Sequence, residues 1–528
     1  MIDLRKSSQR TILFLLAATL PAIAQTTQPV NLNIDARATT TPFPHFWEQT
    51  FGSGRAILAL RDDYRYDLQQ VKQATDFKSV RFHAIFHDEV GLYDPGRQLK
   101  DPSLPAEAAN DRSVYNFSYV DQIYDGLLAS GVRPYVELSF MPRKMSSDPT
   151  ASHPFWYAPN VNPPKDYKLW DDMITTFAQH LIARYGIDEV ATWDFEVWNE
   201  PNLDFWMGSP KQSTYFTLYD HTARALKAVS PRLIVGGPST AQAGWVPDFL
   251  KHTHDNNVPV DFVSTHVYAN DTSENVFHTS DPSDRQTMVY RAVKMVHDQI
   301  AASAYPNIPL IFSEYNATYT SEPDVTDSPY MGPWLANNIR LCDGLVNNMA
   351  YWAFSDVFEE GGVPRTPFYG GFGLIANDRI PKASFNIFAA LHKLGTERIP
   401  VDSDSTLATR TADGHLVLAL WDYAPPTGIG HQYTKPSGPA GPSKDFTVHI
   451  DHVSAHAAVT VWRIDDDHSN VLKAFDAMGR PDGSLTQDQI RQLRIAGQMS
   501  PPEHLHLDHN NLHLTVPAHG LAVVVFEK

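Results

Sequence analysis

The feature that most constrains the fold is an eightfold alternation of short apolar runs with longer segments of helical length. This alternation favours a parallel sheet covered by helices. Eight units predict an α/β fold, the closed (β/α)8 TIM barrel, with functional residues at the C-terminal ends of its strands. A doubly wound open sheet is the alternative, but no Gly-rich phosphate loop follows the first run. We expect strands near 46–51, 79–86, 133–140, 192–199, 233–236, 262–268, 310–314 and 349–354, and helices near 61–74, 119–130, 167–185, 215–229, 247–256, 285–304, 333–346 and 383–394.

The C-terminal part of the chain has a different rhythm. From about Val401 the pattern is that of antiparallel strands separated by turn-rich loops, which predicts a β-sandwich. We therefore expect a barrel over 41–397 and a β-sandwich domain over 398–528. Residues 25–40 contain an alternating strand of antiparallel type, which we expect to join the sandwich. The expected sandwich strands lie near 416–421, 446–450, 459–464, 512–516 and 521–526, with a helix near 485–495 inserted between two of them.

The first 24 residues have the pattern of an export signal. Arg5, Lys6 and Arg10 precede the short apolar run 11–20, and Ala22-Ile23-Ala24 is a small-x-small cleavage site. The run is about half of the roughly 20 residues that a membrane span needs, and a retained N-terminal anchor is the alternative. We expect cleavage after Ala24 and a secreted or periplasmic protein.

Charge and cysteine content narrow the possible partners. The formal net charge of −18 disfavours binding to nucleic acid or an anionic membrane and suits a neutral substrate. The single cysteine, Cys342, excludes an intramolecular disulfide and reads as a buried thiol. His252 and His254 are two residues apart and no HExxH or CxxC motif occurs, so we expect neither a metal nor a cofactor. The sequence does not indicate an oligomeric state.

Two acidic residues follow apolar runs at positions where the barrel would bring them together. In the segment 196–202 (EVWNEPN), Pro201 ends the fourth strand and so places Glu200 at the barrel rim. The neighbouring Asn199 can offer its side-chain amide to a sugar hydroxyl. Glu314 ends the seventh strand. A lone carboxylate at a rim is usually solvated or ion-paired. Two carboxylates facing each other across the mouth can cleave a glycosidic bond, with retention at a separation of about 5 to 5.5 Å and inversion at about 6.5 to 9.5 Å.

Further segments match a known family. The chain resembles glycoside hydrolase family 39, within the clan of (β/α)8 retaining glycosidases, over roughly residues 40–395. The resemblance implies that Glu200 is the acid/base and Glu314 the nucleophile, and the family's best-known activities are β-xylosidase and α-L-iduronidase. One departure is Ala84, where relatives often carry Gly. The matching segments are 43–48 (FPHFWE), 81–88 (RFHAIFHD), 137–142 (ELSFMP), 198–202 (WNEPN), 262–268 (FVSTHVY), 313–315 (SEY) and 351–360 (YWAFSDVFEE).

Other residues at the expected rim are candidate substrate contacts. His266 and Tyr268 lie at the end of strand six, beside the strand that carries Glu314. We expect Tyr268 to hydrogen-bond the Glu314 carboxylate. On strand two, His83 is placed to bind sugar hydroxyls and Arg81 to orient a catalytic carboxylate. Core packing is the alternative for Tyr268, and a structural hydrogen bond is the alternative for His83 and Arg81.

The last candidates flank strands eight and one. Glu359 and Glu360 follow strand eight in a Gly-rich loop, and one of them, preferably Glu360, would bind a pair of sugar hydroxyls. Trp352 would form the floor of the sugar site, and His45 would contact ligand at strand one. For the two glutamates a solvated acidic loop is the alternative.

The leading hypothesis is a retaining, exo-acting glycosidase that releases terminal β-D-xylose from xylo-oligosaccharides by double displacement. A second hypothesis keeps this chemistry but changes the sugar to an α-L-arabinopyranoside, a β-galactoside or a uronide. The carboxylate of a uronide could face Arg365 or Arg379 in the late loops. A third is a non-catalytic carbohydrate-binding protein, which would not need both carboxylates.

Overall fold

The computed structural model describes residues 28–95, 114–424, 441–454 and 457–527. The expected leader, 1–24, lies outside them. Within these residues eight parallel strands close into a barrel, which confirms the predicted fold class. No helix in this part of the chain combines the length and apolarity needed to span a membrane. In barrel order the strands are β10 (Asn348–Tyr351), β3 (Thr50–Arg55), β4 (Ser79–His83), β5 (Arg133–Leu138), β6 (Asp194–Val197), β7 (Ile234–Thr240), β8 (Phe262–Tyr268) and β9 (Leu310–Asn316).

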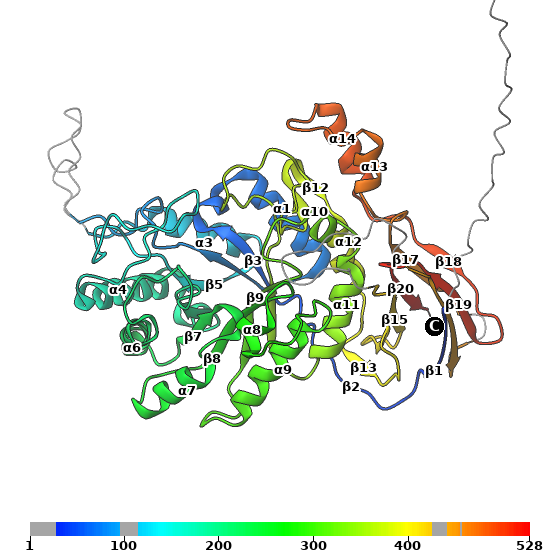
Figure 1. The fold of residues 1–528 in the computed structure, drawn as a ribbon, viewed down its shortest axis with the longest axis horizontal. Helices are drawn as coiled ribbons and strands as arrows, with labels where there is room; N and C mark the ends of the chain where they lie inside the picture. The colour runs from blue at the N-terminus through cyan, green and yellow to red at the C-terminus, as the bar shows by residue number, and fades with distance from the viewer. Residues whose placement is uncertain (1–27, 96–113, 425–440, 455–456, 528) are drawn as a thin grey trace, which may run out of the picture.

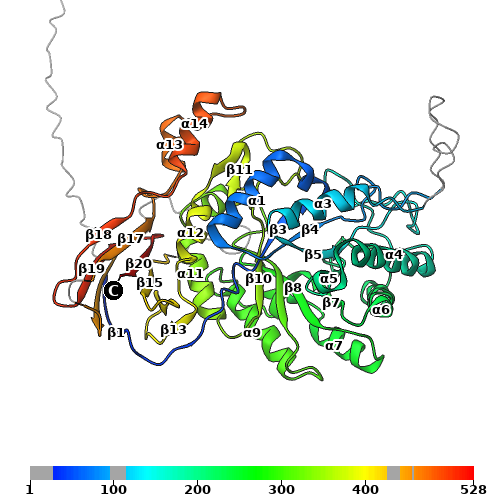
Figure 2. The same cartoon turned by 180° about the vertical axis from the view of Figure 1, so that it is seen from behind.

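Amphipathic helices cover the outside of the barrel (Figures 1 and 2). In α9 (Met288–Ala301), for example, the residues 288, 289, 292, 293, 296 and 300 are buried. This three-to-four-residue spacing forms one apolar stripe that packs on the barrel. The other long helices are α1 (Asp62–Thr75), α3 (Ser118–Ala129), α4 (Tyr167–Tyr185), α6 (Lys211–Val229), α7 (Val246–Asp255), α11 (Met331–Cys342) and α12 (Ala383–Leu391). The shorter elements are η1 (Ala56–Leu60), α5 (Ile187–Val190), η2 (Ala241–Ala243), α8 (Ser273–Phe277), α10 (Pro323–Thr326), β11 (Ile375–Ala376), η3 (Asn377–Arg379) and β12 (Ile380–Pro381).

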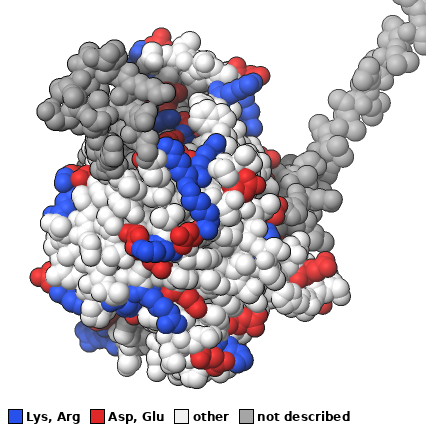
Figure 3. Space-filling view, turned by 90° about the vertical axis from the view of Figure 1, so that its left-hand side faces the viewer, with Lys and Arg blue, Asp and Glu red and all other residues white. Residues whose placement is uncertain are grey.

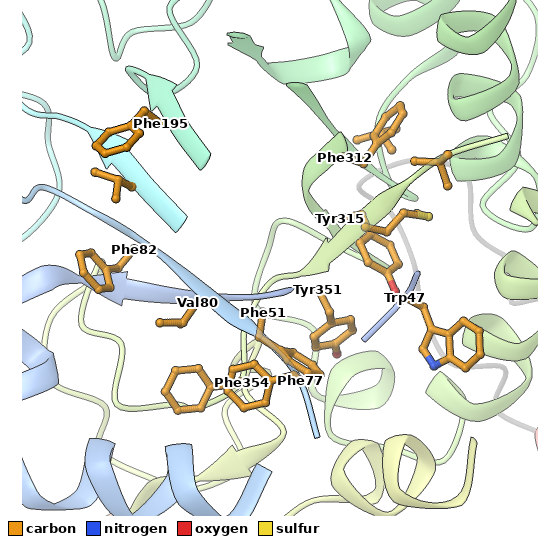
Figure 4. Packing of buried hydrophobic residues seen from close by; sticks show 14 of the residues in the cluster. Trp47, Phe51, Phe77, Val80, Phe82, Phe195, Phe312, Tyr315, Tyr351 and Phe354 are labelled. Atoms are coloured by element: carbon orange, nitrogen blue, oxygen red, sulfur yellow. The ribbon is translucent and has the colours of Figure 1, made fainter. Parts of the chain in front are cut away.

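The first barrel strand begins four residues later than the sequence suggests. The expected strand at 46–51 is largely a buried aromatic segment, in which Phe46 and Trp47 are almost inaccessible to solvent. These side chains pack where the chain enters the barrel, and Figure 4 shows Trp47 among the aromatic residues around Tyr351. The apolar run 43–48 is therefore part of the core before the strand.

The C-terminal domain consists of two sheets, and the one that contains β15, β17 and β20 packs against α11 and α12 (Figure 1). Their facing side chains form a separate apolar core that includes Leu32, Val448 and Val524. β1 does join this domain, but it pairs with β16 in parallel and not in the expected antiparallel direction. One sheet has the order β1 (Gln28–Asp35), β16 (Lys444–Asp451), β19 (Asn511–Val516). The other has the order β18 (Glu503–Leu505), β17 (Val459–Ile464), β20 (Leu521–Phe526), β15 (Leu416–Trp421), β14 (Thr406–Arg410), β13 (Glu397–Ile399), β2 (Thr41–Pro42).

A helical insertion reaches from the sandwich toward the barrel. It consists of α13 (Leu472–Ala477) and α14 (Gln487–Ala496), and α14 corresponds to the helix expected near 485–495. Figure 2 shows both helices above the sandwich, near β11. Phe475 packs on Phe368, with the ring centroids 4.8 Å apart, so the insertion contacts the loop that follows β10.

The surface shown in Figure 3 carries basic and acidic side chains interspersed on a mostly uncharged face. This mixture differs from the continuous basic surface typical of nucleic-acid-binding proteins.

Candidate active site

A cavity of about 340 Å³ opens at the C-terminal ends of the barrel strands. Polar and aromatic side chains from most of the strand ends line it, which is the composition of a site for a polar ligand with apolar faces. The lining residues are His83, Phe155, Asn199, Glu200, Leu203, Phe205, Ala241, Gln242, Tyr268, Asp271, Glu314, Tyr319, Trp352, Glu360 and Phe372.

Glu200 lies in a tight turn that begins where β6 ends. Its φ of 44° lies in the left-handed region, which is unfavourable for a residue with a side chain. The turn is held by a hydrogen bond from the Glu200 amide to the carbonyl of Ser239 in β7, at 2.8 Å. Asn202 adds two bonds to the main chain of Ala241, one in each direction and both 2.9 Å long. The strained turn is thus fixed to the neighbouring strand, which directs Glu200 into the cavity.

Glu314 lies in β9 and is held by two strong donors. The Arg81 guanidinium donates to Oε1 at 2.6 Å, and the Tyr268 hydroxyl donates to Oε2 at 2.7 Å. Charge-assisted bonds of this kind hold a carboxylate in its ionised form and in one orientation. Tyr268 therefore makes the contact that the sequence analysis expected of it.

The two carboxylates face each other. One oxygen of Glu200, one oxygen of Glu314 and a ring nitrogen of His266 all lie within 4.8 Å of one another. This spacing is close to the roughly 5 to 5.5 Å of retaining glycosidases and shorter than the roughly 6.5 to 9.5 Å that an inverting enzyme needs for its water. The pair can therefore accommodate attack by one carboxylate and proton transfer by the other at the same carbon.

The protonation of Glu200 differs from that of an ordinary glutamate. Burial raises the pKa of Glu200 to about 7, and the cations His83 and Arg81 only partly oppose this effect. His266 Nδ1 lies 3.0 Å from Glu200 Oε1. Because burial lowers the pKa of His266 to about 4, this histidine is neutral and adds no positive charge that would ionise Glu200. Glu200 can therefore hold a proton opposite Glu314, which pairs with the Arg81 guanidinium.

Arg81 is the centre of a buried charge network beneath the cavity. The side chain is inaccessible to solvent, and besides Glu314 it binds Glu196 at 2.6 Å and Glu137 at 2.7 Å. It also donates to Asn199 Oδ1 at 2.9 Å, which leaves the amide nitrogen of Asn199 to donate to a ligand. Arg81 thus orients Glu314 and Asn199 from below and does not line the cavity.

His83 connects this network to the far wall. Its Nδ1 is 2.7 Å from Glu137, and its Nε2 is 3.5 Å from Glu360 Oε1. Burial lowers the pKa of His83, but the charge and hydrogen bond of Glu137 and the charge of Glu314 outweigh it and raise the pKa to about 9. His83 therefore presents a charged N–H donor to the cavity, next to the Trp352 ring at 4.7 Å.

Glu360 lines the cavity, whereas its neighbour Glu359 does not. Burial raises the pKa of Glu360 to about 8, so that a neutral carboxyl group can both donate to and accept from sugar hydroxyls. Glu359 points the other way and pairs with Arg55 at 3.1 Å and with Arg61. The expectation that Glu359 binds a hydroxyl is thus corrected, because two arginines bind both of its oxygens.

The expectation for His45 is also wrong. His45 precedes β3 and therefore lies toward the N-terminal end of the barrel, opposite the cavity. There the Nδ1 atom of His45 is 2.5 Å from Glu48, and the His45 ring stacks on Trp47 with the centroids 4.5 Å apart. Glu48 also lies 2.7 Å from Nδ1 of His392. His45 also precedes the strand expected at 46–51, so that strand itself places the residue at the N-terminal end, whereas ligand contacts lie at the C-terminal ends.

Several residues of the cavity and of the charge network beneath it were missed by the sequence analysis. Glu137 and Glu196 interrupt apolar strands, and a charged residue in such a strand needs a buried partner, so this signal was available. The loop residues Gln242 and Asp271 and the aromatic side chain Phe155 follow no local rule, because the loops that carry them meet only in the closed barrel.

Among the described residues, three groups of histidine and glutamate are close enough to share a metal ion. Two of them, His83–Glu137–Glu314 and Glu200–His266–Glu314, belong to the cavity. The oxygens of Glu314 already accept bonds from Arg81 and Tyr268, and the charge of Arg81 opposes a cation there. The geometry therefore fits acid–base and nucleophilic chemistry better than metal binding.

Comparison with known proteins agrees with this geometry. The model for "Glycosyl hydrolases family 39" matches residues 30–503. The chain belongs to this family. It is 36% identical to a β-xylosidase of Geobacillus stearothermophilus over 450 residues, covering 83% of this chain and 84% of the relative. It is 33% identical to a β-xylosidase of Caldicellulosiruptor saccharolyticus over 463 residues, covering 86% and 88%.

A solved structure of the same family has the same fold. The crystal structure of a monomeric β-xylosidase from Caulobacter crescentus CB15 is 33% identical, with a TM-score of 0.82, and the alignment covers 94% of this chain and 99% of that one. As a member of family 39, a family of retaining enzymes, the chain is a glycosidase. The short distance between Glu200 and Glu314 is in accord with retention.

Proposed function

We propose that this glycosidase is an exo-acting β-D-xylosidase, with Glu314 as its nucleophile and Glu200 as its acid/base. The observation that carries the assignment of roles is the opposed pair itself. Glu314 is held in place by the Arg81 guanidinium and the Tyr268 hydroxyl, while burial raises the pKa of Glu200 to about 7. The similarity to two named β-xylosidases over more than four-fifths of each chain supports the choice of sugar.

In the first step a Glu314 oxygen attacks the anomeric carbon, and the bond from that carbon to the leaving oxygen breaks. Glu200 transfers its proton to the leaving oxygen, so that a neutral alcohol departs. The product is a glycosyl ester on Glu314. Neutralisation of Glu314 removes a negative charge near Glu200 and so lowers the pKa of Glu200.

In the second step Glu200, now ionised, takes a proton from water while the water oxygen attacks the anomeric carbon. The ester bond to Glu314 breaks, and the sugar leaves with its original configuration. Glu200 is protonated again, which restores the starting state. Neutral His266, 3.0 Å from Glu200, holds this carboxyl group in position in both steps.

The loops support exo action. The amide of Trp156, in the loop after β5, donates to the carbonyl of Glu360, in the loop after β10, at 2.9 Å. This bond joins two loops above the part of the cavity that holds Glu360 and Trp352. We infer that loops joined in this way close the cavity on that side, and a closed end accepts the terminal sugar of a chain and excludes an internal one.

The lining also favours a neutral sugar over a uronide. The described lining residues include four acidic residues and His83, but neither lysine nor arginine. Of the two arginines considered for a uronide, Arg379 pairs with Asp62 and Asp63 on α1, and Arg365 is not among the lining residues. A uronide carboxylate would therefore find neither a guanidinium nor an ammonium group to pair with among these described residues.

The test is a panel of 4-nitrophenyl glycosides in the β-D-xyloside, α-L-arabinopyranoside, β-D-galactoside and β-D-glucuronide forms, with NMR of the first sugar released. We expect kcat/KM to be highest for the xyloside, with β-xylose formed first. Glu314→Ala should abolish turnover on the best substrate, whereas Glu189→Ala on α5, a matched change outside the cavity, should not. A higher kcat/KM on another sugar would reject the substrate, and retained turnover in Glu314→Ala would reject the nucleophile.

We further propose that the chain is exported and cleaved after Ala24. The basic start, the apolar run 11–20 and the Ala22-Ile23-Ala24 site support this proposal. Expression of the full chain in a bacterial host should give a mature protein that begins at Gln25, as read by mass spectrometry. Recovery of residues 1–24 on the protein would contradict it.

A further inference from the structure

The position of Glu200 determines where the leaving group must lie. If Glu200 protonates the leaving oxygen, as proposed above, the departing alcohol lies on the Glu200 side of the cavity. The Glu200 main chain is bonded to β7 through Ser239, and its side chain contacts His266 of β8. The loops after β7 and β8 therefore border the leaving group, whereas Glu360 and Trp352 border the other side.

Two polar residues from these loops line the cavity and have no role in the two chemical steps. They are Gln242, directly after β7, and Asp271, directly after β8. Asp271 is 3% exposed, and its Oδ2 accepts the amide of Tyr268 at 2.8 Å. Its Oδ1 has only a long contact to the Gln242 amide nitrogen, at 3.4 Å. A buried carboxyl oxygen with such a weak partner can gain a stronger hydrogen bond from a ligand.

The backbone of Gln242 adds a second observation. Its φ is 60°, in the left-handed region that a residue with a side chain rarely adopts. The hydrogen bonds between Asn202 and Ala241 fix the preceding residue, so the loop holds Gln242 in this conformation. Strain maintained in this way is characteristic of functional sites, and here it keeps the side chain at the cavity wall.

Apolar side chains complete this half of the cavity. Leu203 and Phe205 line it from the loop after β6. The ring of Phe205 is fixed by stacking on His153, with the centroids 4.0 Å apart. A flat apolar wall beside a carboxyl and an amide matches a pyranose ring, which has an apolar face and hydroxyls at its edge.

We propose that Asp271 and Gln242 form a leaving-group subsite that recognises a sugar through its hydroxyls. Asp271 Oδ1 accepts a hydrogen bond from one hydroxyl of the leaving sugar, and the Gln242 side chain binds a neighbouring one. The substrate class is thus an oligosaccharide, in which the leaving group is itself a sugar, and not a glycoside of a small alcohol or a phenol. This inference rests on the proposed acid role of Glu200.

The experiment compares two substrates that share the transferred sugar and differ only in the leaving group, xylobiose and 4-nitrophenyl β-D-xyloside. Asp271→Ala and Gln242→Ala are measured on both, with Glu274→Ala, exposed in α8 of the same loop, as the matched control. We expect kcat/KM on xylobiose to fall roughly 3- to 10-fold in each variant, as for loss of one hydrogen bond. On the nitrophenyl substrate both variants should stay within about threefold of the wild type, as should Glu274→Ala on either substrate.

Equal losses on the two substrates would overturn the inference, because Asp271 would then act only through the Tyr268 main chain it holds. Unchanged kcat/KM on xylobiose in both variants would overturn it too. If Asp271→Ala does not fold, the Gln242→Ala comparison decides alone. Should the wild type prefer another sugar, the proposed xylosidase function fails, and the same comparison is made with the disaccharide and the nitrophenyl glycoside of that sugar.

Discussion

The proton on Glu200 should control the alkaline limb of the pH–rate profile. Burial raises the pKa of this carboxyl from 4.5 to about 7, which corresponds to about 3 kcal/mol in favour of the protonated form. Only that form can donate to the leaving oxygen, so activity should be lost as the pH rises through this value. We expect kcat/KM on xylobiose to fall about tenfold per pH unit above 7, and so to be about 100-fold lower at pH 9 than on the plateau.

The assay is kcat/KM on xylobiose from pH 5 to 9.5, since this parameter reports ionisations of the free enzyme. Glu200→Gln cannot ionise, so its residual activity should lack the loss that begins near pH 7, and any remaining loss should follow the higher pKa values of Glu360 and His83. A dinitrophenyl xyloside, whose leaving group needs no proton, should form the glycosyl-enzyme with Glu200→Gln at nearly the wild-type rate. An alkaline limb that persists unchanged in Glu200→Gln would show that another group carries the proton and would refute the reasoning.

Two further predictions concern the groups that hold Glu314. Arg81→Met leaves three buried carboxylates without their common cation and should lower the free energy of unfolding by about 3–5 kcal/mol in urea titrations. Arg184→Met, in an exposed pair with Asp125, is the control and should have a much smaller effect. Equal losses in the two variants would contradict the network. Tyr268→Phe removes the 2.7 Å hydrogen bond to Glu314. This variant should lower kcat on the aryl xyloside roughly 10- to 100-fold and leave KM within about threefold of the wild type. A change in KM alone would show that Tyr268 serves only binding.

The sequence was sufficient to predict the barrel because its evidence is periodic. Runs such as 262–268 are buried along their whole length, and stripes such as that of α9 repeat over several turns. Glu200 and Glu314 follow from the same periodicity, since both come where an apolar run ends and parallel strands end on one side of the sheet. The first strand was misplaced because the segment 43–48 is as apolar as a strand but packs as part of the core.

The remaining site depends on contacts between distant segments. Glu359 and Glu360 are adjacent and chemically identical, and what separates them is the position of Arg55 and Arg61, far earlier in the chain. The direction of the β1–β16 pairing was missed for a similar reason. An alternating pattern reports that one face is buried and does not report which way the partner strand runs.

The parallel pairing of β1 with β16 has a consequence for assembly of the protein. Gln28 is opposite Lys444, so the first strand described finds its partner only after the whole barrel has been synthesised. Closing so long a loop is slow, and until then the apolar side chains of Leu32 and Ile34 have no sheet to cover them. A shortened chain that keeps the barrel but ends before β16 would retain an open apolar strand edge, a typical starting point for aggregation.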